Sequence, residues 1–396
     1  MATGVRRLTT VLVLFLTGCG GRDGSAPPPA ARNLILVTVD TLRSDRVGAY
    51  DYPAARTPGF DALARSGVLF TEAFAVAPIT MTAHASLMTG LYPPGHGARH
   101  NGMRLGASPR TLAQALRDAG FATAAFVGAF PLDRRFGLDR GFDVYGDAMP
   151  RDAQGRPLNE RPARVVAGDA AAWLEQHRES RFFLWVHFFE PHAPYGDART
   201  GRAVADRYDD EIAEADAQMR RVLEAAGEQR SRTLVAVTAD HGEAFGEHGE
   251  VAHSIFVYDT TLRVPLVIAG PGVSRRDVTV PVSHVDVPST LLSLLGVQTF
   301  DTDGVNLQPV MAGSEAASRE LYAESYAPLL DFGWSPLRSL RQDGWKYIEA
   351  PREELYEVSG DPLEARNLAA QDQTRARALR ERLERYTAAT PPTSAD

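Results

Sequence analysis

The sequence is poor in two residue types that often carry chemistry. Cys19 is the only cysteine among the 396 residues, and Lys346 is the only lysine. A single cysteine excludes an internal disulfide and leaves the folded part without a cysteine-ligated metal. The net charge is −8 and no long basic run is present, so nucleic-acid binding has no support. Arginine supplies nearly all the positive charge, and we attach no function to that composition.

A long apolar run is also missing at the N-terminus. The run at residues 11–16 is too short to span a bilayer, and it follows Arg6 and Arg7. The next residues are L-T-G-C, which resemble a bacterial lipoprotein cleavage site that ends at Cys19. We therefore expect a signal peptide at residues 1–18 and a lipid on Cys19. An ordinary signal peptide with a chance cysteine is the alternative.

Residues 19–31 are rich in Gly, Ser and Pro without apolar periodicity, which is typical of a flexible tether. The lipid and this tether predict an exported protein anchored to the periplasmic face of the bacterial envelope, with the outer membrane as the expected site. The lipid would be its only contact with the membrane.

Strand-like and helix-like segments alternate after the tether. Residues 34–39 form an apolar, β-branched run that is typical of a buried parallel strand. Further strands are expected at residues 123–127, 182–186, 234–238 and 264–268, and helices at 57–66, 82–89, 111–119, 163–177 and 208–225. This alternation predicts an α/β fold with helices on both faces of a mostly parallel sheet.

The pattern changes near Gly313. Short strands are expected at residues 321–325, 345–349 and 354–357, and a charged helix at 373–387. We expect a main domain at residues 32–312, a small C-terminal α+β subdomain at 313–388, and a disordered tail at 389–396.

Two of the predicted strands end in residues that bind metals. Asp40 follows the first, and Asp240 with His241 follows the strand at 234–238. Ligands bind beyond the carboxyl ends of strands in such sheets, and a carboxylate beside an imidazole suits Zn²⁺ or Mn²⁺. One such aspartate alone is more often a helix cap, but two strands ending in this way favour a metal site.

Thr80 lies between these strands, just before the helix expected at residues 82–89. A hydroxyl at a helix N-terminus meets a partial positive charge and free N–H groups, which favours an alkoxide and a transferring oxyanion. A capping threonine is the alternative.

Several motifs resemble, in the same order, those of the sulfatase family of the alkaline-phosphatase superfamily. They are V-T-V-D-T-L-R-S-D, T-P-G-F-D-A-L-A-R-S-G-V-L-F-T-E-A-F, A-H-A-S-L-M-T-G-L-Y-P, H-F-F-E-P-H-A-P-Y, T-A-D-H-G-E, T-L-R-V-P-L-V-I-A-G-P-G and E-E-L-Y-E-V-S-G-D-P-L-E-A-R-N-L. The resemblance runs from Asn33 to Leu368. It implies an alkaline-phosphatase-like α/β/α sandwich and a metal-dependent hydrolase of phosphate or sulfate esters.

The sequence departs from that family at the nucleophile. A sulfatase has Cys or Ser there, which is converted to formylglycine, whereas this chain has Thr80. Threonine cannot become that aldehyde, so we expect no formylglycine. Thr41 replaces the second aspartate of the usual pair. The resemblance to threonine-using phosphoryl transferases implies one divalent ion (Zn, Mn or Ca) held by Asp40, Thr80, Asp240 and His241.

The resemblance also implies roles for histidines. His192 matches a substrate-contacting histidine, and His253 lies near a residue that binds the transferred group. His84 replaces an arginine and is expected to contact the substrate or to assist Thr80. Three weaker candidates are His96, His187 and His248. A second ion would draw on His192, His248 and His253, but we expect one.

Three other functions stay open. They are a true sulfuric-ester hydrolase that uses Thr80, an envelope phospho-headgroup transferase, and a non-catalytic lipid-tethered binding protein. The transferases resembled here usually have several N-terminal membrane helices, and a pure binder needs no such set of four residues. The substrate is expected to be a small-molecule, glycan or lipid-headgroup ester. The loop at 150–162 and the turn at Gly333 and Trp334 are expected to shape its pocket.

Overall fold

The computed structural model describes Met1 and residues 31–387. Cys19, the signal peptide apart from Met1, the tether up to residue 30 and the tail at 389–396 lie outside the described residues. The expectations about them stay predictions. Within the described part, no helix has both the length and the apolar composition needed to cross a membrane.

A central sheet of nine strands forms the main layer, in the order β4-β3-β5-β1-β6-β7-β2-β8, with β9 beside β2. The strands are β1 (Asn33–Val39), β2 (Val68–Phe74), β3 (Ala122–Val127), β4 (Val144–Gly146), β5 (Phe182–Phe188), β6 (Thr233–Ala239), β7 (Arg263–Ala269), β8 (Arg276–Val278) and β9 (Val282–Ser283). The first five strands of this order are parallel, and β7 runs antiparallel to both β6 and β2. This confirms the expected mostly parallel sheet.

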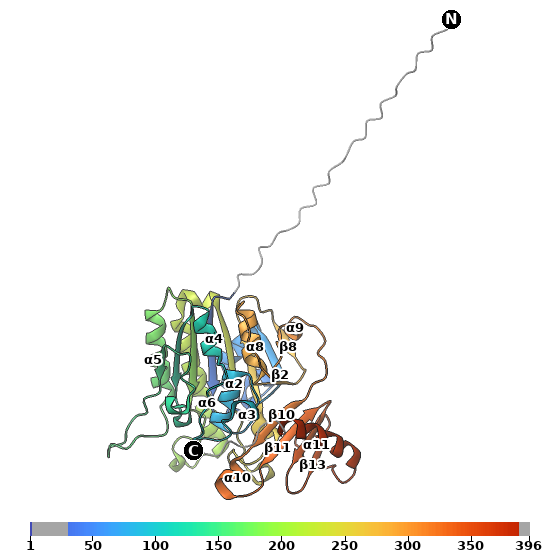
Figure 1. The fold of residues 1–396 in the computed structure, drawn as a ribbon. Helices are drawn as coiled ribbons and strands as arrows, with labels where there is room; N and C mark the ends of the chain where they lie inside the picture. Colours follow the sequence, from blue (N-terminus) through green and yellow to red (C-terminus); the bar gives the residue numbers. More distant parts are fainter. Residues whose placement is uncertain (2–30, 388–396) are drawn as a thin grey trace.

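Two groups of helices cover the sheet (Figure 1). One group consists of α1 (Pro58–Ser66), α5 (Ala163–Gln176) and α6 (Val204–Ala225), and the other of α2 (Thr80–Thr89), α4 (Leu112–Asp118) and α8 (Asp286–Leu294). The central strands β1, β5 and β6 are buried along their whole length because both faces of the sheet are covered. Their carboxyl ends therefore meet at one protected edge.

A second, antiparallel sheet forms the C-terminal part, as expected. Its strands are β10 (Leu321–Ser325), β11 (Leu337–Gln342), β12 (Trp345–Glu349) and β13 (Glu354–Glu357). The helix α11 (Gln373–Thr387) packs on β11 and β12 over a separate apolar cluster that includes Tyr347 and Leu383. The short helix α10 (Ala327–Phe332) connects β10 to β11.

The only lysine of the sequence joins the two sheets. Lys346 on β12 is 2% exposed, and its Nζ lies 2.7 Å from Asp259 Oδ1 and 2.6 Å from Glu364 Oε1. Asp259 begins the short helix α7 (Asp259–Leu262) of the main domain and also pairs with Arg341 of β11. Because buried charges must be paired, this network fixes the C-terminal sheet to the segment that leads into β7.

Several elements were not expected from the sequence. They are β2, β4, β8, β9, β11 and α8, with the short helices α3 (Pro93–His96), α7, α9 (Gln308–Met311) and α10. Strands of two or three residues show no periodicity to detect. The apolar run of α8 is buried over most of its length, so its pattern does not distinguish one face from the other.

Candidate functional site

The site lies at the carboxyl ends of the neighbouring strands β1 and β6. Val39 pairs with Ala239, so Asp40 and Asp240 follow at equivalent positions of two adjacent parallel strands. Asp40, Asp240 and His241 are each 0% exposed. The register of the sheet therefore brings the three predicted metal ligands together, although 200 residues separate the aspartates in the sequence.

These three side chains face one another with atoms that have no hydrogen-bond partner in the described part of the chain. One ligand atom from each lies within 4.8 Å of the others, and His241 Nε2 is 3.6 Å from Asp240 Oδ2 and 3.9 Å from Asp40 Oδ1. Both oxygens of Asp40, Oδ2 of Asp240 and Nε2 of His241 are buried and unpaired. Buried polar atoms without partners are rare, so a cation between them would explain the arrangement.

Backbone contacts orient the free atoms of this cluster. Asp240 Oδ1 accepts hydrogen bonds from the Thr41 N–H (3.1 Å) and the His241 N–H (2.8 Å), which leaves Oδ2 free. His241 Nδ1 lies 3.0 Å from the Gly242 carbonyl. A carbonyl only accepts, so Nδ1 carries the proton and Nε2 presents its lone pair to the cluster. Both residues are thus held as ligands.

Thr41 occupies an unusual backbone position for a β-branched residue. Its φ is 55°, in the left-handed region that such side chains seldom adopt. This conformation accompanies the hydrogen bond from its N–H to Asp240, and its own Oγ1 is buried without a partner. Thr41 therefore adds a neutral oxygen next to Asp40, at the position where the usual sulfatase pair has its second aspartate.

The two carboxylates have opposite pKa shifts. Burial, and then repulsion from Asp240, raises the pKa of Asp40 to about 8. Burial also acts to raise the pKa of Asp240, but the nearby histidines outweigh it and hold this pKa below its ordinary value. Two close buried carboxylates cannot both remain charged without compensation, and a divalent cation is one way to provide it.

Thr80 is the first residue of α2, whereas the sequence analysis placed it just before the helix. Ile79 holds the N-cap position, and its apolar side chain makes no capping hydrogen bond. Thr80 is 3% exposed, and within residues 31–387 its hydroxyl has no hydrogen-bond partner. The capping alternative is therefore wrong, since this hydroxyl caps nothing.

His84 links Thr80 to the cluster. Its Nδ1 donates to the Thr80 carbonyl (2.8 Å) and lies 3.7 Å from Asp240 Oδ2. Its Nε2 accepts from the Thr38 hydroxyl (3.0 Å), which accepts in turn from Trp185 Nε1 (3.0 Å). Burial lowers the pKa of His84 to about 3. Burial is complete and both ring nitrogens have partners, and this position fits the other expectation for His84, that it supports Thr80.

His187 has the opposite arrangement. The Gly128 N–H donates to its Nδ1 (3.3 Å), so the ring proton lies on Nε2, which faces Asp40 Oδ2 at 3.5 Å. Although His84, His187 and Asp240 also lie close together, neither imidazole has a lone pair free for a cation. His187 is therefore placed to donate to Asp40.

His192 and His253 lie beside the cluster, on its more open side. The His253 ring is 4.4 Å from that of His241 and 5.0 Å from that of His192. His192 stacks on Phe189, and its Nδ1 donates to the Ala193 carbonyl (2.7 Å). Both predicted histidines thus adjoin the metal-ligand candidates.

The sequence analysis missed Glu243, the last residue of T-A-D-H-G-E. It is 0% exposed, and its two oxygens contact His253 Nδ1 (2.9 Å) and the Tyr195 hydroxyl (2.5 Å). A carboxylate that binds one nitrogen of an imidazole fixes the direction of the other. Its position three residues after Asp240, just beyond a metal-binding strand end, was the available signal.

We expect Glu243→Gln to lower kcat/KM about ten-fold while the affinity for the metal stays unchanged, because the amide cannot hold the His253 ring as a carboxylate does. Steady-state kinetics and a metal titration would measure this. Tyr195→Phe is the matched control, since it removes the other partner of Glu243, and its effect should be smaller. An equal loss in both variants would contradict the interpretation that Glu243 acts by orienting the His253 ring.

The other two weaker candidates, His96 and His248, lie outside the cluster. His96 is buried, accepts from the Ala98 N–H and donates to Ser86 Oγ, which fixes the chain after α3 against α2. His248 stacks on Tyr258 at 3.6 Å. His284, which the sequence did not single out, is buried behind β6 and donates to the Ala239 carbonyl (3.0 Å).

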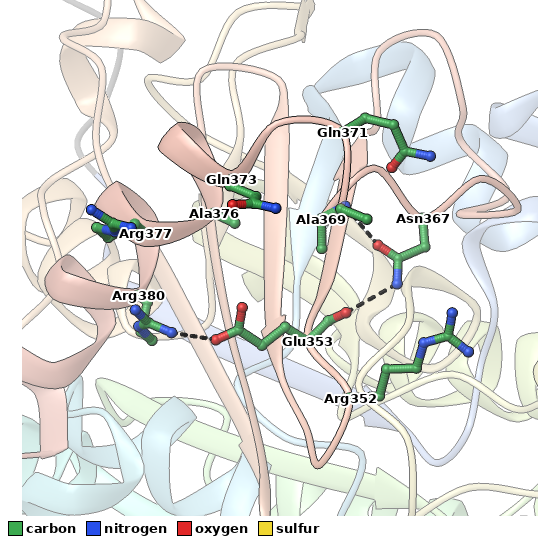
Figure 2. A pocket seen from close by; sticks show the side chains of 10 residues that line it. Arg352, Glu353, Asn367, Ala369, Gln371, Gln373, Ala376, Arg377 and Arg380 are labelled. Atoms are coloured by element: carbon green, nitrogen blue, oxygen red, sulfur yellow. Dashed lines mark hydrogen bonds and ion pairs between the residues drawn. The ribbon is translucent and has the colours of Figure 1, made fainter.

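Two larger hollows lie away from these residues. A cavity of about 980 Å³ separates the β8–β9 region from the C-terminal sheet. A pocket of about 460 Å³ lies beside α11, where Figure 2 shows Arg380 paired with Glu353 and Asn367 bound to the Glu353 carbonyl. Neither contains a carboxylate–imidazole cluster, so the chemistry points to the strand ends.

Two family models match this chain. A family model described as Sulfatase matches residues 32–297, and one described as N-sulphoglucosamine sulphohydrolase, C-terminal, matches residues 246–389. The sequence is 26% identical over 416 residues to the "Uncharacterized sulfatase YidJ" of Escherichia coli (strain K12), covering 85% of this chain and 82% of that protein. It is 27% identical over 433 residues to the choline-sulfatase of Rhizobium meliloti (strain 1021), with the same two coverages.

The fold is similar to that of solved ester hydrolases. Against the phosphonate monoester hydrolase of Agrobacterium radiobacter the TM-score is 0.75 at 23% sequence identity, covering 90% of this chain and 95% of the other. The first family model spans more than half of the sequence, including Asp40, Thr80, Asp240 and His241. This chain therefore belongs to the sulfatase family of ester hydrolases.

Proposed function

We propose that this protein is a metal-dependent hydrolase that cleaves phosphate esters through a covalent intermediate on Thr80. The observation that carries the proposal is the position of Thr80. Thr80 starts α2, and its hydroxyl has no hydrogen-bond partner among the described residues. Its carbonyl accepts a hydrogen bond from His84 Nδ1, which also lies 3.7 Å from Asp240 Oδ2 in the candidate metal site. A nucleophile, a helix N-terminus and a candidate metal site are thus combined.

Asp40, Asp240 and His241 would hold one divalent cation. Two carboxylates and an imidazole suit Zn²⁺ or Mn²⁺, and the carboxylate oxygens also suit Ca²⁺. When bound, such an ion supplies a Lewis acid that polarises the ester and lowers the pKa of a nearby hydroxyl. Thr80 would be its fourth ligand.

The residues of this chain supply the other parts of the reaction. Thr80 Oγ forms a bond to phosphorus as the bond from phosphorus to the alcohol oxygen breaks. The hydroxyl loses one proton and the alcohol gains one, and His253, whose ring contacts Glu243, would carry this proton. N–H groups in the first turn of α2 stabilise the charge on the transferred group. Water then cleaves the Oγ–P bond, which releases phosphate and restores Thr80.

Threonine favours phosphate over sulfate in this proposal. A sulfatase expels sulfate from a hydrated aldehyde, which threonine cannot form, whereas a phosphothreonine can be hydrolysed by water. Sulfate esters are the second candidate, because curated relatives such as the choline-sulfatase are named for them. We further propose that the protein is exported and anchored through a lipid on Cys19, which would place the site at the cell envelope.

A panel of aryl phosphate monoesters, phosphodiesters and sulfates tests the proposal, with metal-free protein and with added Zn²⁺, Mn²⁺ or Ca²⁺. We expect metal-dependent turnover of a phosphate ester, with sulfate turnover at least about 100-fold slower, a difference of about 2.7 kcal/mol in activation free energy. Turnover of sulfate without phosphate would contradict the argument from threonine. Metal binding without any turnover would favour a binding protein.

A further inference from the structure

Three large apolar side chains are exposed together on α10 and the turn after it. Leu330, Phe332 and Trp334 are 50%, 54% and 60% exposed. The Phe332 and Trp334 rings stack at a centroid distance of 4.8 Å and an angle of 25°. We call these three residues the apolar patch. Single exposed apolar residues are common, but three so close together in the chain, two of them stacked, mark a contact surface.

One side of α10 is tied to the segment that carries Thr80. Asp331 lies on α10 between Leu330 and Phe332, and its Oδ1 is 3.0 Å from His100 Nε2. Asn101, the residue after His100, accepts a hydrogen bond from the Met81 N–H (3.0 Å) with its side-chain oxygen. Met81 follows Thr80, so the patch is two short contacts away from the proposed nucleophile.

The other side of α10 is tied to the segment that carries His253. Ser325 ends β10 just before α10, and its hydroxyl donates to the Ser254 carbonyl. Ser254 follows His253, which adjoins the metal-ligand candidate His241. Figure 1 shows α10 at the lower edge of the molecule, below α2 and α3. Short contacts therefore connect the α10 region to both the segment that carries Thr80 and the segment that carries His253.

We infer that the apolar patch binds a flat apolar face on the alcohol part of the ester, an inference that rests on the function proposed above. Aromatic rings stack on other rings and on the C–H face of sugars, so aryl alcohols and pyranoses share the required chemistry. The patch thereby selects esters by their leaving group, while Thr80 and its neighbours act on the transferred group.

The charges around the patch favour a neutral leaving group over a membrane. Residues 327–336 contain no lysine or arginine, and their one carboxylate, Asp331, pairs with His100. Segments that bind an anionic lipid surface combine aromatic residues with basic ones. A second anionic group on the substrate would also find no cation in this segment.

The first test measures turnover of phenyl, methyl and hexose phosphates by the full chain. Every protein in the test carries Cys19→Ser, which removes the proposed lipidation site. We expect the ratio of kcat/KM for phenyl over methyl phosphate to fall about ten-fold in Phe332→Ala/Trp334→Ala, mainly through KM. Val144→Ala, a comparably exposed apolar residue on the opposite edge strand β4, should not change this ratio. The comparison of hexose phosphate with phenyl phosphate decides whether the patch prefers sugar rings or aryl rings. An unchanged ratio for both rings would overturn the inference.

The second test needs no turnover and so separates this inference from the proposed function. Calorimetry on the Thr80→Ala protein should show phenyl phosphate binding about ten-fold more weakly once the patch is removed. A loss of this kind supports the subsite even if Thr80→Ala still cleaves esters, an outcome that would defeat only the proposed nucleophile. Patch-dependent sedimentation with phosphatidylcholine vesicles, together with equal binding of both esters, would overturn the inference in favour of membrane docking.

Discussion

Thr80→Ala is expected to reduce kcat for phosphate esters by about 10⁴-fold or more, because the covalent route disappears with the hydroxyl while the remaining site stays assembled. The side chain makes no hydrogen bond within the described part of the chain, and His84 contacts only its backbone carbonyl. The fold should therefore persist, and Asp40, Asp240 and His241 should still bind the metal, with a lower affinity because the fourth ligand is lost. Steady-state kinetics on metal-loaded protein would measure the loss.

Thr80→Ser is the matched control for this prediction. It keeps the hydroxyl and should retain a large part of the activity. Rapid quenching of the native protein should yield a phosphorylated peptide that contains Thr80, and the alanine variant should yield none. If Thr80→Ala retained most of its activity, water would have to be the direct nucleophile and the covalent mechanism would be wrong.

Asp240→Asn is expected to abolish stabilisation by divalent metals. At a free metal concentration 100 times the Kd, binding should raise the free energy of unfolding of the native chain by about 2.7 kcal/mol, and that of the variant by almost nothing. Asparagine can still accept from the Thr41 and His241 N–H groups through its oxygen. The substitution therefore removes one ligand charge with little change in shape. Thermal unfolding after chelation, with and without Zn²⁺, Mn²⁺ or Ca²⁺, would measure both proteins.

Without metal, the Asp240→Asn protein should keep most of the native stability, because the amide removes the repulsion that raises the pKa of Asp40 but also loses the attraction to the histidines that lowers the pKa of Asp240. Asp216→Asn is the matched control. Asp216 is also buried and accepts from the N–H groups of Gly59 and Phe60, so its loss should lower stability with and without metal and leave the metal effect intact. Equal metal stabilisation of native and Asp240→Asn proteins would place the ion elsewhere.

The metal-ligand candidates could be located from the sequence because their positions depend on one simple geometric rule. Parallel strands end at the same edge, so Asp40 and Asp240 were expected at one edge once residues 34–39 and 234–238 were identified as strands of one sheet. The structure shows in addition that these two strands are neighbours. Thr80 was found by its place at a helix start, although the helix begins two residues earlier than residue 82, where it was predicted to begin. Family resemblance supplied the link between these three segments.

The histidines could not be ranked in the same way. His84 and His187 look alike in the sequence, yet Thr38 and the Thr80 carbonyl engage one ring, and the Gly128 N–H sets the proton of the other. These partners come from other parts of the chain, and they decide which nitrogen keeps a lone pair. Glu243 is hidden for the same reason, since only folding brings it against His253.

The sequence by itself therefore determined the α/β class, the edge of the sheet that carries the chemistry, and the candidates Asp40, Thr80, Asp240 and His241. Periodicity and strand ends encode these features locally. The tertiary structure alone decided which atoms stay unpaired at that edge, which histidines lie there, and that the α10 region contacts the segments that carry Thr80 and His253. Such properties depend on contacts between residues far apart in the chain, and no local pattern records them.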